Sequence, residues 1–88
     1  MIKDYIKESE LLKALAHPVR LRMVEGLMTQ ECNVNKMVNG LKVPQSTVSQ
    51  HLSLLRSRGI VTVRKEGVKT CYKVLDPKAK AIVKALQG

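Results

Sequence analysis

The feature that most constrains this chain is a change of hydrophobic periodicity at Gly59. Upstream, Val48, Leu52 and Leu55 recur at i, i+4 and i+7, which gives one apolar face to a helix opening at Pro44. Downstream, apolar and polar residues alternate with a period of two, which is typical of a strand. Glycine commonly ends helices, so Gly59 predicts the boundary. The chain must therefore pass directly from a helix into β structure.

The β structure is predicted to be a hairpin with a basic tip. Residues 60–65 alternate, Gly67 supplies a turn, and residues 69–74 run back. Before it we expect helices over 3–16, over 18–29 with Pro18 in the first turn, and over 34–40 with Asn33 as cap. A last helix follows Asp76 and Pro77. The order α-α-α-α-β-β-α is mainly α with a β-hairpin wing (α+β).

This order is the layout of a winged helix-turn-helix. We expect one domain over residues 1–88, with the helix-turn-helix at 34–58 and the wing at 60–75. The net charge of +9 lies entirely after residue 16 and is densest over 60–75, which favours a polyanionic partner. A solvated basic surface is the alternative. No apolar run reaches membrane-spanning length and no signal-peptide pattern is present, so we expect a cytoplasmic protein without membrane contact.

The fourth helix has the chemistry of a recognition helix. Its first two turns carry short polar side chains that can approach base edges in the major groove, and Gln can contact adenine bidentately. A merely solvated helix face is the alternative, although such a face more often carries Glu, Lys and Ala. Wing cations would contact phosphates and fix register. The predicted contacts to double-stranded DNA are Gln45, Ser46, Thr47, Ser49, Gln50, His51, Arg56, Arg64, Lys65 and Lys69.

Three stretches together resemble the ArsR/SmtB family of repressors: residues 11–21, residues 45–55, and residues 59–67 followed by Tyr72. The resemblance implies a homodimer formed through terminal helices at 1–16 and 76–88, and repression at a near-palindromic operator. Metal-sensing relatives place Cys-Val-Cys-Asp where this chain has Asn33-Val34-Asn35-Lys36. Amides are poor ligands for soft metals, and the last helix offers only Asp76. We therefore expect no metal at these sites and no cofactor.

The two cysteines leave alternatives open. Cys32 is predicted to be a small buried residue, with a thiolate ligand or redox thiol as the alternative. If Tyr72 and Val74 face the core, Cys71 faces solvent, where neighbouring lysines would lower the pKa of its thiol. A disulfide is not expected in a cytosolic protein. Whether Cys32 and Cys71 lie close enough to react with each other cannot be predicted from the sequence. His17 is predicted to cap a helix junction, and His51 to pack or to contact a phosphate.

Several functions compete. A DNA-binding repressor leads, either without a ligand or as a thiol-based sensor of oxidants, persulfides or arsenite through Cys32 and Cys71. A winged helix that binds protein or RNA is the alternative of another class. An enzyme is not expected, because the sequence has no paired carboxylates, no glycine-rich phosphate loop and no nucleophile–base pair.

Overall fold

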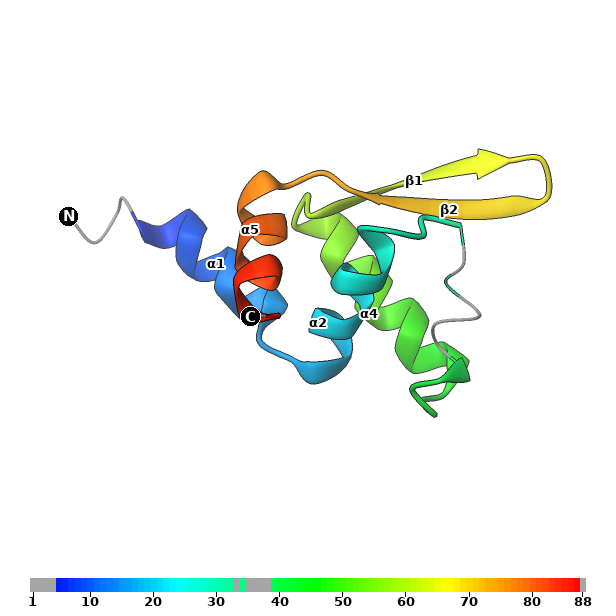
Figure 1. The fold of residues 1–88 in the computed structure, drawn as a ribbon, viewed down its shortest axis with the longest axis horizontal. Coiled ribbons are helices and arrows are strands. Elements are labelled where there is room, and N and C mark those ends of the chain that lie inside the picture. The colour runs from blue at the N-terminus through cyan, green and yellow to red at the C-terminus, as the bar shows by residue number, and fades with distance from the viewer. Residues whose placement is uncertain (1–4, 33, 35–38, 88) are drawn as a thin grey trace.

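The computed structural model describes residues 5–32, 34 and 39–87. Its elements follow the chain in the order α1 (Ile6–Leu15), α2 (Pro18–Leu27), α4 (Gln45–Ser57), β1 (Val61–Glu66), β2 (Lys69–Val74) and α5 (Pro77–Leu86) (Figure 1). The fold is a winged helix-turn-helix, as predicted. The expected third helix over 34–40, with its cap Asn33, lies largely outside the described residues. No described helix combines the length and apolar character that a bilayer span requires.

Helix starts follow from local side-chain chemistry. His17 Nδ1 accepts a hydrogen bond from the backbone N–H of Val19 at 3.1 Å, which confirms the predicted junction cap before Pro18. Asp76 Oδ1 accepts from the N–H groups of Lys78 and Ala79 at 2.8 and 3.3 Å and starts α5. These contacts satisfy N–H groups that have no partner inside their own helices.

The switch from helix to hairpin occurs where the periodicity changes. Gly59 has φ +73°, the left-handed conformation expected of the residue that ends α4. β1 and β2 pair antiparallel from Val61 opposite Val74 to Glu66 opposite Lys69. The hairpin extends well beyond the helices and forms the wing (Figure 1).

The core lies where α1, α2, α4, α5 and the base of the wing converge. Leu15, Val24, Leu27, Leu55 and Ile60 are almost completely buried. The predicted α4 stripe is confirmed: its apolar positions are all in this core. Burial of these side chains stabilises the fold because it removes apolar surface from water.

The terminal helices keep apolar surface in solvent. Figure 1 shows α1 beside α5, and Lys78 Nζ joins Glu8 Oε1 at 3.0 Å between them. Large apolar side chains on these helices nevertheless remain more than half exposed: Tyr5, Ile6, Leu12 and Leu86. Apolar surface at α1 and α5 is therefore not covered within this copy of the chain.

Candidate nucleic-acid interface

The recognition helix α4 has one buried face and one polar face. Val48 and Leu55 are fully buried and Leu52 is 6% exposed. The predicted base-contacting residues lie on the other side: Gln45, Ser46, Ser49 and Gln50 are exposed, and Thr47 is half-buried. Pro44 precedes the helix and gives no side-chain cap, so the first N–H groups of α4 receive no side-chain hydrogen bond from it. A helix start of this kind favours an anion.

His51 connects α4 to the junction between α1 and α2. Its ring lies 4.5 Å from that of His17, centroid to centroid, and its Nδ1 is 3.2 Å from a guanidinium nitrogen of Arg20. Arg20 also donates to the carbonyl oxygens of Lys13 and Ala14. Burial lowers the pKa of His51, and the charges of His17 and Arg20 lower it further. His51 therefore packs at an interhelical contact, which confirms the packing predicted for it, although sequence spacing did not indicate its partners His17 and Arg20.

The cations of the wing fall into two groups. Arg64 donates to Glu31 at 2.6 Å and to Glu66 at 2.9 Å, and these hydrogen bonds raise the pKa of its guanidinium. Lys65 donates to the neutral hydroxyl of Thr70 at 3.1 Å, so its charge is not balanced by that contact. Lys69, like Arg56 on α4, is exposed. Among the predicted DNA contacts, Arg64 is thus a cation that already pairs with carboxylates of its own chain, and these would compete with DNA phosphates for it.

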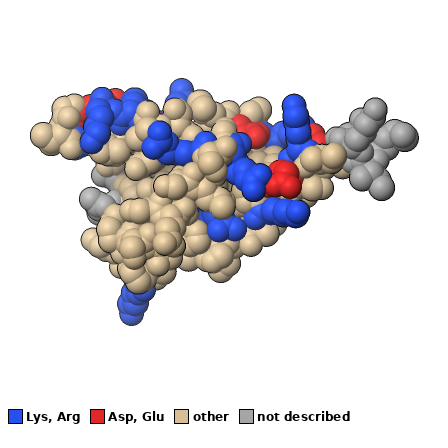
Figure 2. All heavy atoms as spheres, turned by 180° about the vertical axis from the view of Figure 1, so that it is seen from behind, with Lys and Arg blue, Asp and Glu red and all other residues tan. Residues whose placement is uncertain are grey.

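Many Lys and Arg side chains lie on one face of the molecule. Figure 2 shows them along the wing and across the upper surface towards the N-terminal end, where acidic side chains lie among them. The lobe around the start of α4 carries little charge in the same view. A charged wing beside a helix whose first turns are polar and uncharged suits phosphate contacts at one place and base contacts at the other.

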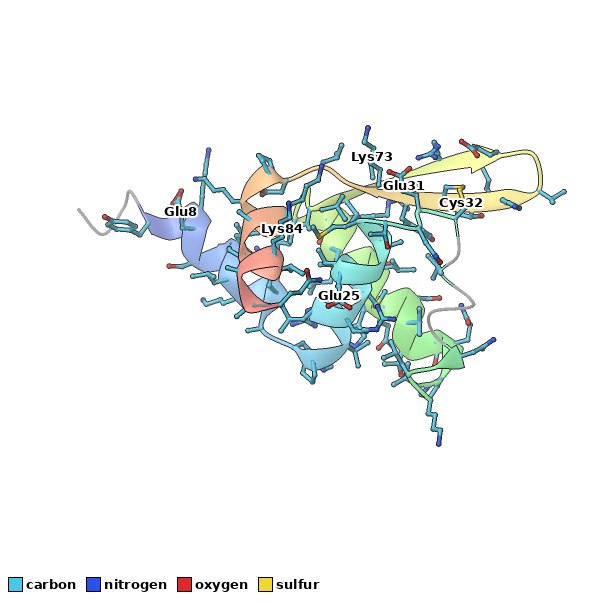
Figure 3. All side chains as sticks on the ribbon, in the orientation of Figure 1. Glu8, Glu25, Glu31, Cys32, Lys73 and Lys84 are labelled. Carbon is cyan, nitrogen blue, oxygen red and sulfur yellow. A yellow bond between two sulfur atoms is a disulfide. The ribbon has the colours of Figure 1, made fainter. Side chains whose placement is uncertain are left out.

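The cysteines correct three predictions. Cys32 is half-buried rather than buried. Cys71 is completely buried rather than facing solvent, and it forms a disulfide with Cys32 across a sequence separation of 39 residues (Figure 3). The cause lies in the segment after α2: the carbonyl oxygen of Glu31 accepts from the N–H of Tyr72 at 2.8 Å, which places that segment against β2. The segment that buries Cys71 is distant from it in the sequence, so the alternation of residues along β2 alone could not predict this burial.

The metal sites known from the family do not fit this chain. Asn33, Asn35 and Lys36 lie outside the described residues, and their side chains offer no thiolate in place of the missing cysteines. Asp76 uses a carboxylate oxygen to cap α5, and no histidine follows it in the sequence. Neither position therefore carries the ligands that metal sensing would need.

The fold, the polar face of α4 and the basic wing define a winged helix-turn-helix regulator that binds DNA. Residues 17–63 match the model described as "Bacterial regulatory protein, arsR family". The chain belongs to this family.

Individual relatives agree over nearly the whole chain. The transcriptional repressor PagR of Bacillus anthracis is 40% identical over 80 residues, which cover 90% of this chain and 80% of PagR. The structure of reduced HlyU from Vibrio cholerae superposes with a TM-score of 0.89 at 36% identity, covering 99% of this chain and 92% of HlyU. The PagR crystal structure gives a TM-score of 0.79 and covers 98% and 99% of the two chains. The likeness therefore includes the terminal helices as well as the helix-turn-helix.

Proposed function

We propose that this chain represses transcription as a homodimer that places α4 of each copy in the major groove of a near-palindromic operator. The observation that carries the proposal is the division of α4 between buried Val48 and Leu55 and exposed Gln45 and Gln50. An anchored helix with short polar side chains can approach base edges closely. Arg56, Lys65 and Lys69 would contact the phosphate backbone, and Arg64 would join them only after leaving its carboxylates.

Repression is favoured by relatives described as repressors, PagR among them. HlyU of Vibrio cholerae, by contrast, is described as a transcriptional activator. The direction of regulation is therefore the part of the proposal that most needs a direct experiment.

Footprinting upstream of the chain's own gene tests the proposal. We expect protection of two related half-sites about 34–36 Å apart along the duplex, one for each α4 of a dimer. A reporter behind that promoter should become less active when the protein is supplied. Absence of a protected site at physiological salt, together with binding to RNA or to a protein, would instead favour an interaction module.

A second candidate is a thiol-based sensor within the same regulator. The disulfide between Cys32 and Cys71 favours it, because it joins the segment after α2 to wing strand β2. In the sensing step, the thiols of Cys32 and Cys71 would lose two protons and two electrons as the disulfide forms. A hydroperoxide would accept them, and its O–O bond would break to give water and an alcohol.

Operator affinity of oxidised and reduced protein tests this candidate. We expect oxidation to change the affinity of the unmodified protein and to leave a Cys32→Ser, Cys71→Ser variant unchanged. Persulfide and arsenite treatments extend the comparison to the other thiol reagents. Equal affinities in all states would leave a regulator without a thiol signal, controlled by its own abundance.

A further inference from the structure

Three potential ligand groups meet beneath the wing. They are the sulfur atoms of Cys32 and Cys71 and a carboxylate oxygen of Glu66, and all lie within 4.8 Å of one another. Cys32 Sγ is 3.9 Å from Glu66 Oε2. The groups come from the segment after α2, from β1 and from β2, and Figure 3 shows the disulfide of Cys32 lying against the wing. The fold itself therefore brings them together.

Two carboxylates beside this cluster share a single guanidinium. Arg64 is shared by the carboxylates of Glu31 and Glu66, so these three side chains together carry one negative charge. Two thiolates would add two more. A divalent cation would reduce this charge.

The two carboxylate oxygens of Glu66 contact different partners. Oε1 accepts from Nε of Arg64 at 2.9 Å, while Oε2 faces Cys32. Arg64 thereby orients the carboxylate with Oε2 directed at the sulfur atoms. A charged partner that fixes a ligand in this way is common behind metal-binding carboxylates.

We propose that the reduced protein holds a thiophilic divalent cation, of the zinc or cadmium class, between Cys32, Cys71 and Glu66. Two thiolates and a carboxylate supply three positions of a tetrahedral site. The Glu66 side chain is 55% exposed, so a water molecule can reach the fourth. With metal–sulfur bonds of about 2.3 Å, tetrahedral thiolates lie roughly 3.8 Å apart, close to the contact distance of two unbonded sulfur atoms.

Cation binding and the disulfide exclude each other. A dithiol reductant first transfers two electrons and two protons to the Cys32–Cys71 bond and becomes a disulfide itself. The cation then displaces the two thiol protons, which are released to solvent as two metal–sulfur bonds form. The site goes beyond the proposed regulator function. Cation binding to it can be measured in the absence of DNA.

Titration of the reduced full-length chain with Cd²⁺ alone, without oxygen, tests the proposal. We expect ultraviolet sulfur-to-cadmium charge-transfer absorption that saturates at one ion per chain, and its loss when excess Zn²⁺ competes. The same protein oxidised to the disulfide should give no such absorption. This comparison needs no substitution, so it holds even where a cysteine variant folds poorly.

Matched carboxylate variants test the third ligand. Glu66→Gln should weaken Cd²⁺ binding by about tenfold or more. Glu25→Gln, which removes a carboxylate paired with Arg22 elsewhere, should leave it unchanged. Undiminished charge transfer in the oxidised protein, no absorption in the reduced one, or equal effects of the two glutamine variants would overturn the proposed site. Operator binding by the unmodified protein is tested independently of these results. The cation site and the proposed regulator function can therefore be refuted separately.

Discussion

At the scale of single residues, His51 is where the recognition helix contacts the junction between α1 and α2. Burial holds its pKa below the ordinary 6.5, with His17 and Arg20 adding to the effect. The folded state therefore binds a proton less readily than the unfolded chain does. Its contribution to the free energy of unfolding is complete above pH 6.5 and declines as pH falls towards the folded value.

We expect the His51 ring to titrate below pH 6.5 in an NMR titration of the folded protein. We also expect His51→Gln to reduce the loss of stability on acidification, because that side chain cannot take up a proton. Urea unfolding across the same pH range measures the second effect. A ring midpoint at or above 6.5 would contradict the lowered pKa.

Gly59 gives a second prediction at this scale. Its φ of +73° is the left-handed conformation, and an added Cβ would meet nothing within 4 Å. Gly59→Ala should therefore cost about 1–2 kcal/mol in free energy of unfolding, almost all from the backbone. Gly59→Asn should cost less, because asparagine tolerates this region better. Equal stability of all three proteins in urea would show that the helix end can relax.

Residues whose environment comes from a distant segment are the ones that the sequence predicts least well. The contact of His51 with Arg20 spans 31 positions, and the cover over Cys71 comes from Glu31 and Cys32. Helical and strand periods describe only neighbours along one element. Residues that depend on their own element, such as Val48 and Gly59, were predicted correctly for that reason.

At the scale of elements, the wing is expected to supply affinity without sequence preference. Lys65→Ala should weaken binding to operator and to random DNA by the same factor and reduce the dependence of affinity on salt. Arg22→Ala on α2 removes an equal charge outside both the predicted DNA contacts and the terminal helices, and serves as control. Fluorescence anisotropy over a range of salt concentrations measures both. A selective loss of operator binding would instead give Lys65 a role in base recognition.

Most boundaries of helices and strands could be predicted because the residues at each boundary have characteristic capping or turn chemistry. Pro18 and the pair Asp76-Pro77 start helices where predicted, and the alternation after Gly59 predicted both strands. The second helix ends at Leu27, two positions before the expected residue 29. No glycine cap or proline stops that helix; its end is closed by hydrogen bonds from the N–H and hydroxyl groups of Thr29 to the carbonyl oxygen of Gly26.

At the scale of the whole molecule, the exposed apolar face of α1 and α5 is the expected dimer interface. Leu12 is 52% exposed in one copy of the chain, so Leu12→Asp should leave the core intact. In a dimer it would bury a charge against apolar side chains. We expect sedimentation equilibrium to show at least a tenfold rise in the dimer dissociation constant. Ser53→Asp, which adds the same charge on α4, should not change it.

Competition between operator and scrambled duplex at physiological salt tests whether α4 recognises specific DNA. The unmodified protein should prefer its operator strongly. Gln50→Ala should reduce that preference by about 1–3 kcal/mol for each base that the Gln50 amide recognises, with little change in binding to the scrambled duplex. An unchanged preference would remove Gln50 from base recognition, and no preference in the unmodified protein would contradict α4 as a recognition helix.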